Sequence, residues 1–161
     1  MEWPPIFTCD NYSKTITDSL QYCRENKGLL VHAYVIMPTH VHLILSAGGP
    51  VSLSEIIRDF KKYTSRATTR LLNADANHLF LWVFKRAAQK ASEGSTHKVW
   101  TDDNHPETIT SESFFRQKLD YLHDNPRRKG LVDSPDHWLY SSAKTYYLGV
   151  RGVLDVDYLE W

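Results

Sequence analysis

The sequence has 161 residues, of which 42% are hydrophobic and 24% charged, and this composition fits one globular domain over residues 1–161. No apolar stretch is long enough to cross a bilayer, and two cysteines cannot form a disulfide framework, so we expect a cytoplasmic protein without a membrane anchor. The net charge is zero, yet residues 58–98 carry nine Lys or Arg against three Asp or Glu. This basic segment favours a polyanionic partner such as nucleic acid, although it also fits a solvated helix surface.

The first part of the chain predicts a helix followed by two strands. Apolar residues recur at helical spacing over 12–26, and Gly28 suits the end of that helix. Residues 29–37 are rich in Val, Ile and Tyr without helical spacing, which predicts a buried strand. Residues 40–46 predict a second strand, joined to the first by a tight turn at Pro38.

The remaining chain predicts mainly helices. A capping-box pattern at Ser52 precedes an apolar stripe over 53–71, whose other sides are basic. Two more helices are expected at 79–90 and 114–123, the second ending at Asn125-Pro126. After a short helix near 141–146 we expect a small terminal strand over 153–156. This order predicts an α+β fold with an antiparallel sheet.

His40 and His42 begin the second predicted strand and are the most informative residues. Side chains two apart share one face of a strand, at a Cβ separation of about 7 Å, so both imidazoles can reach one ion. Two histidines leave coordination positions open, and an open divalent ion can bind a phosphate oxygen. A structural role in the core fits the same spacing.

The segment around these histidines, Tyr34-Val-Ile-Met-Pro-Thr-His-Val-His-Leu-Ile44, resembles the signature hairpin of the HUH single-tyrosine transposases. The similarity is closest to the REP-associated tyrosine transposase group. Four further segments match in the same order, at residues 60–66, 99–106, 118–126 and 130–143.

The resemblance implies a ferredoxin-like antiparallel sheet with helices packed on it, followed by a C-terminal extension. It implies DNA transposition by metal-dependent nicking and rejoining of hairpin-forming single-stranded DNA, in which a tyrosine becomes linked to the 5′ end. By the same resemblance His40 and His42 bind Mg²⁺ or Mn²⁺.

One departure concerns the nucleophile. In many relatives the tyrosine lies four residues after the tryptophan that aligns with Trp100, and here that position is Asn104. An amide cannot form the phosphotyrosine bond, so either Tyr121 or Tyr63 acts instead or cleavage has been lost. The alternatives are a structured-DNA-binding derivative without catalysis and a phosphodiesterase that uses activated water.

The sequence leaves three candidates for the third metal ligand. His105 is preferred because it lies next to the usual nucleophile position, while Gln117 and Glu107 are the other candidates.

A second departure is at the start, where relatives usually have another strand. Only a few residues, two of them prolines, precede Phe7, so we expect this first strand to be truncated. The uncovered edge would favour a homodimer.

The expected DNA-binding residues lie on the basic helix and in the cationic run after Pro126. The run also fits a role in binding the terminal carbonyls of its helix. These residues are Arg58, Lys61, Lys62, Arg66, Arg127, Arg128 and Lys129.

Overall fold

The computed structural model describes residues 4–90, 96–101 and 106–160. The described part has two strands, five α-helices and two short 3₁₀ helices. In chain order these are η1 (Ile6–Thr8), α1 (Asp10–Lys27), β1 (Leu29–Ile36), β2 (Val41–Ala47), α2 (Leu53–Ala74), α3 (His78–Lys90), α4 (Glu112–Arg128), η2 (Pro135–His137) and α5 (Ala143–Leu148). None of the described helices is long and apolar enough to span a membrane.

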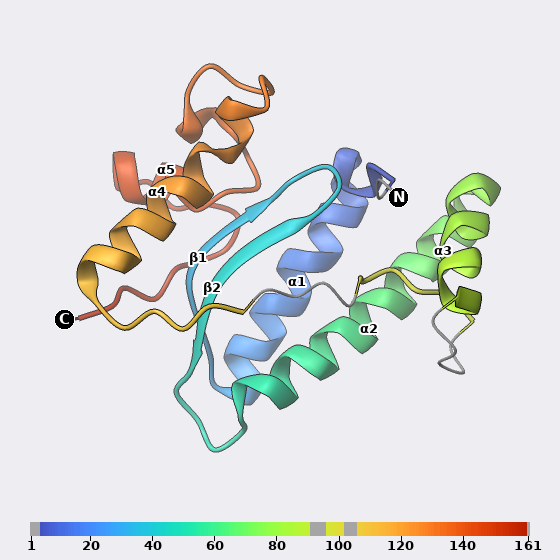
Figure 1. The fold of residues 1–161 in the computed structure, drawn as a ribbon, viewed down its shortest axis with the longest axis horizontal. Helices are drawn as coiled ribbons and strands as arrows, with labels where there is room; N and C mark the ends of the chain where they lie inside the picture. Colours follow the sequence, from blue (N-terminus) through green and yellow to red (C-terminus); the bar gives the residue numbers. More distant parts are fainter. Residues whose placement is uncertain (1–3, 91–95, 102–105, 161) are drawn as a thin grey trace.

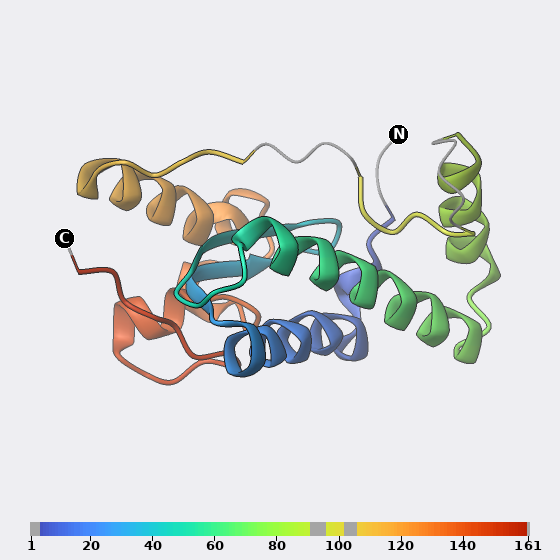
Figure 2. The same ribbon diagram turned by 90° about the horizontal axis from the view of Figure 1, so that it is seen from below.

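Strands β1 and β2 form an antiparallel hairpin with helices on both faces. Helices α1 and α2 cover one face, where Tyr34, Ile36 and Leu43 join their core, and α4 covers the other (Figures 1 and 2). On the α4 side, Ile44 packs with Phe115 and its neighbours. The α+β class with an antiparallel sheet is thereby confirmed.

A β-bulge at His32 sets which side chains face each layer. Val31 pairs with Leu45 and Ala33 pairs with Ile44, so His32 is the extra residue on β1. The bulge changes the alternation, because Val31 belongs to the core beside α1 whereas Ala33 packs towards α4.

The outer edge of β1 is covered by the C-terminal part of the chain. The Ile36 N–H donates to the carbonyl of Tyr140, and the Ser142 N–H donates to the carbonyl of Tyr34. Within the described residues no strand precedes α1, as expected, but residues 140–142 and Asp157 occupy this edge. The homodimer stays a prediction, without the uncovered β1 edge that motivated it.

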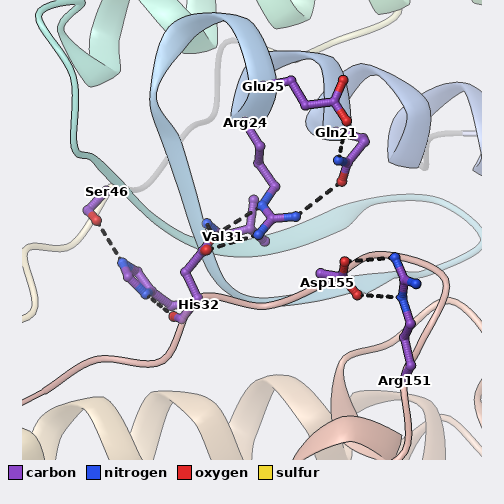
Figure 3. A network of polar contacts seen from close by, with 9 residues as sticks. Gln21, Arg24, Glu25, Val31, His32, Ser46, Arg151 and Asp155 are labelled. Atoms are coloured by element: carbon purple, nitrogen blue, oxygen red, sulfur yellow. Dashed lines mark hydrogen bonds and ion pairs between the residues drawn. The ribbon is translucent and has the colours of Figure 1, made fainter.

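Asp157 fastens the C-terminal segment to β1. Its carboxylate accepts two hydrogen bonds from Arg24 and one from the Val31 N–H, while its own N–H donates to the Val31 carbonyl. The ring of His32 contacts the Asp157 carbonyl and Ser46, which extends the network across the hairpin (Figure 3). Asp157 is therefore the main polar attachment of this segment, and Leu154 and Val156 add apolar packing in the core beside α1.

The predicted terminal strand over 153–156 is wrong. These residues form no ladder with β1; instead the Leu154 N–H donates to the hydroxyl of Tyr34, whose side chain lies between them and the sheet. Backbone pairing with β1 begins only at Asp157.

Helix α4 extends further than expected, because it continues through Pro126 to Arg128. Pro126 has no N–H, so the Leu122 carbonyl loses its helical donor, but the backbone after it stays helical for two more residues. The Asn125 side chain donates to the Tyr121 carbonyl, and the Lys129 N–H donates to the Asn125 carbonyl, so the last turn stays closed. Arg127 and Arg128 therefore lie on the helix rather than after it.

Helix α2 begins with the predicted capping box, in which Ser52 and Glu55 exchange side-chain-to-backbone hydrogen bonds. Further along, the indole of Trp100 donates to Thr64 and anchors the segment that follows α3. Helix α3 lies at the far end of α2, away from the sheet (Figure 1).

Candidate metal and nucleophile site

The rings of His40 and His42 lie side by side at the turn end of β2. Their centroids are 4.8 Å apart and the rings are perpendicular. His42 and Ile44 are two residues apart on β2, so both side chains lie on the face that packs against α4, as the strand pattern predicts. The Nδ1 atom of His40 is within 2.9 Å of the Thr39 hydroxyl, which orients the ring and leaves Nε2 for another partner.

Both rings are held in their neutral form. Burial, and to a smaller extent the neighbouring His40, lowers the pKa of His42 to about 4. Burial also lowers the pKa of His40, aided by the positive charge of Lys129. A neutral imidazole keeps a lone pair, which is the form that binds a metal ion.

The two rings suit a shared divalent ion. Imidazoles that coordinate one ion at about 2.1 Å through nitrogen have ring centres roughly 5 Å apart, close to the observed separation. Among the described residues no third His, Cys, Asp or Glu joins the pair. His105, the preferred third ligand, lies outside the described residues, so it stays a prediction.

Tyr121 lies next to this pair, on the face of α4 that covers β2. Its ring centroid is 6.3 Å from that of His42, in an edge-to-face arrangement, and the side chain is 50% exposed. The guanidinium of Arg128 lies over the same ring, with Cζ 4.9 Å from the centroid. The structure thus brings together two imidazoles, an accessible phenol and an arginine.

Tyr63, the other candidate nucleophile, is on a different layer. It is 61% exposed on α2, which packs with α1 against the opposite face of the sheet. Asn104, at the nucleophile position expected from relatives, lies outside the described residues. Of the other metal candidates, Glu107 forms an ion pair with Lys118, and Gln117 is exposed on α4.

The expected DNA-binding cations differ in their surroundings. Arg58 is paired with Asp59, and Arg127 is paired with Asp124. Lys62 and Arg66 are exposed and form no ion pair within the described residues. Lys61 is partly buried on α2 and is not free of interactions. Lys129 acts on His40 and therefore lies beside the candidate site.

Sequence reasoning missed the contact between Arg128 and Tyr121. Residues seven apart lie two turns apart on the same helix face, so the spacing contained the signal. The expectation that the helix ends at Asn125-Pro126 concealed it.

Comparisons with known proteins identify the family and the fold of this chain. The family described as "Transposase IS200 like" matches residues 5–102, more than half of the chain. Among solved structures, the chain is similar to a REP-associated tyrosine transposase bound to a REP hairpin, with a TM-score of 0.61 and 15% identity. The alignment covers 98% of this chain and 81% of that one, and at this identity it shows the fold. No curated protein matches significantly.

The matched residues include the hairpin with both histidines and the whole of α2. The family carries out DNA transposition, and a transposase must bind DNA. The chain belongs to the IS200-like transposase family.

Proposed function

We propose that the protein nicks and rejoins hairpin-forming single-stranded DNA in the cytoplasm, with Tyr121 as the nucleophile beside a divalent ion held by His40 and His42. The observation that carries this proposal is the edge-to-face contact between Tyr121 and His42, at 6.3 Å between ring centroids. Tyr121 is half exposed, so a DNA backbone can approach its side chain.

The reaction exchanges one phosphoester bond for another. The Tyr121 hydroxyl oxygen attacks the scissile phosphorus, the bond to the 3′ oxygen breaks, and the phosphate stays on the tyrosine at the 5′ end. The phenol proton passes to solvent and the leaving 3′ oxygen takes up a proton. In rejoining, a 3′ hydroxyl attacks the phosphotyrosine and Tyr121 leaves, so no other energy source is needed.

Mg²⁺ or Mn²⁺ bound at His40 and His42 would supply Lewis-acid stabilisation of charge on the scissile phosphate. The neutral imidazoles offer two ligands and leave room for phosphate oxygens. Arg128, fixed over the Tyr121 ring, is the donor that orients the phosphate towards the hydroxyl.

The proposal is tested with the purified chain, Mn²⁺ and hairpin oligonucleotides taken from beside its own gene. A covalent protein–DNA adduct is expected on a denaturing gel. Y121F should abolish the adduct, whereas Y63F, which changes a similarly exposed tyrosine on another layer, should preserve it.

Each other result points either to a different nucleophile or to a different function. An adduct that survives Y121F would refute the assignment of the nucleophile. Hairpin binding without any adduct would favour the structured-DNA-binding derivative. A free 5′ phosphate without attached protein would favour hydrolysis by activated water.

A further inference from the structure

The cations of this protein fall into two groups. On α1, on α4 and near the C-terminus, most are neutralised by neighbouring carboxylates, as in the pairs of Lys14 with Asp18, Arg116 with Glu112 and Arg151 with Asp155. A second group forms no ion pair within the described residues and lies on the exposed sides of α2 and α3. It consists of Lys62, Arg66, Arg70, Lys85, Arg86 and Lys90.

On α2 the unpaired cations follow one line. Lys62, Arg66 and Arg70 are four residues apart, so they share the helix face opposite the buried stripe that contains Phe60 and Thr64. Helix α2 runs from the hairpin to α3, and this line of charge therefore continues towards α3 (Figure 2).

Helix α3 adds aromatic surface to this charge. Trp82 is 54% exposed, and the Arg86 guanidinium carbon lies 4.9 Å from its ring centroid. Leu79 and Lys85, three residues to either side of Trp82, are exposed as well. The helix contains no acidic residue. The exposed indole therefore lies beside two cations, Lys85 and Arg86, with Leu79 as an exposed apolar neighbour, and this combination of positive charge and a flat ring suits a nucleic-acid strand.

We propose that Trp82 and Arg86 form a stacking platform for unpaired bases of the DNA strand outside the hairpin, reached along the basic line of α2. This inference rests on the proposed function for its substrate, and it names a second contact site distant from Tyr121. Positive charge attracts the phosphates, and the indole supplies a flat surface that stacks on bases of any sequence. Duplex DNA offers no free base faces, so the platform selects single strands.

The test measures binding, so it does not depend on cleavage. Fluorescence anisotropy compares two labelled oligonucleotides, a bare hairpin and the same hairpin with a single-stranded flank. W82A is expected to weaken binding of the flanked hairpin about tenfold and to leave the bare hairpin unchanged. W82F should retain most of the affinity.

The control variant removes an exposed aromatic side chain from a different helix. Tyr22 is 57% exposed on α1, where Asp18 and Glu25 lie on the same helix face, so Y22A should not change binding of either oligonucleotide. A second measurement needs no variant: replacing the flank bases by abasic sites should weaken binding to the wild-type chain and leave W82A unaffected.

Three outcomes would overturn the proposal. They are equal affinity of W82A and wild type for the flanked hairpin, equal loss on both oligonucleotides, and insensitivity of the wild type to abasic sites. Failure of the proposed cleavage would leave these binding results unchanged, and so the two proposals are distinguishable.

Discussion

The guanidinium carbon of Arg128 lies 4.9 Å from the centre of the Tyr121 ring, two helical turns further along α4. This contact exists because α4 continues through Pro126 rather than ending before it. An arginine over a tyrosine restricts the ring and presents N–H donors beside the hydroxyl. The contact links the cationic end of α4 with the candidate metal site that includes His42.

Replacing Arg128 by alanine should slow formation of the protein–DNA adduct about 100-fold, because one donor to the phosphate is lost. The rate is measured by quenched single-turnover reactions on a hairpin oligonucleotide. R127A is the matched control, since Arg127 is bound by Asp124 at 2.6 Å and is not over the tyrosine. Equal loss in both variants would show that α4 acts through its charge alone.

Removal of divalent ions with EDTA should abolish adduct formation, and added Mn²⁺ should restore it, because in the proposed site the paired imidazoles would hold the ion. Binding of Mn²⁺ is measured by electron paramagnetic resonance. H42A should weaken this binding at least about tenfold. H137A should not, since His137 is exposed beside Asp136. Unchanged Mn²⁺ affinity in H42A would place the ion elsewhere.

His123 makes the stability of the fold depend on pH. Its ring is fully buried, Nε2 contacts the Ser142 hydroxyl, and Nδ1 has no hydrogen-bond partner among the described residues. Burial lowers its pKa to about 4, from 6.5 in an unfolded chain. The unfolded state therefore binds the proton more tightly, so the contribution of His123 to stability is present well above pH 6.5 and is lost as the pH falls through 6.5 towards 4.

On going from pH 7.5 to pH 5, His123 should lower the free energy of unfolding by about 2 kcal/mol. Urea unfolding of H123Q at both values should show a correspondingly smaller loss than wild type, with the remainder due to other groups such as His42. An identical pH dependence in the two proteins would mean that His123 is not the group responsible.

Asp157 should contribute much more to stability than its neighbour Asp155. Burial works to raise the pKa of Asp157, but hydrogen bonds from Arg24 and Val31 outweigh it and hold the pKa below its ordinary value. D157N should lower the unfolding free energy by about 2 kcal/mol, because those donors lose a charged acceptor. D155N should change it by less than about 0.5 kcal/mol, since the Arg151–Asp155 pair is exposed. Similar effects in urea unfolding would contradict the role given to Asp157.

Local patterns predicted much of this fold because they depend on neighbouring residues. Gly28 ends α1 at a φ of 71°, and Ser52 caps α2 as its spacing with Glu55 indicates. The adjacency of His40 and His42 also followed from strand alternation alone.

Long-range features could not be obtained in this way. The covering of β1 by Asp157 joins residues 126 apart, and no periodicity encodes it. The preference for Tyr121 over Tyr63 likewise required knowing which face of the sheet each helix covers. Both tyrosines are exposed on helices, but only the helix of Tyr121 faces His42.

The central claim is that Tyr121 forms the bond to DNA, and identifying the modified residue tests it most directly. The adduct formed with Mn²⁺ and a hairpin oligonucleotide is digested with nuclease and protease, and its peptides are sequenced by tandem mass spectrometry. We predict a nucleotide attached through phosphate to Tyr121. A nucleotide on Tyr63 or on any other residue would contradict the account.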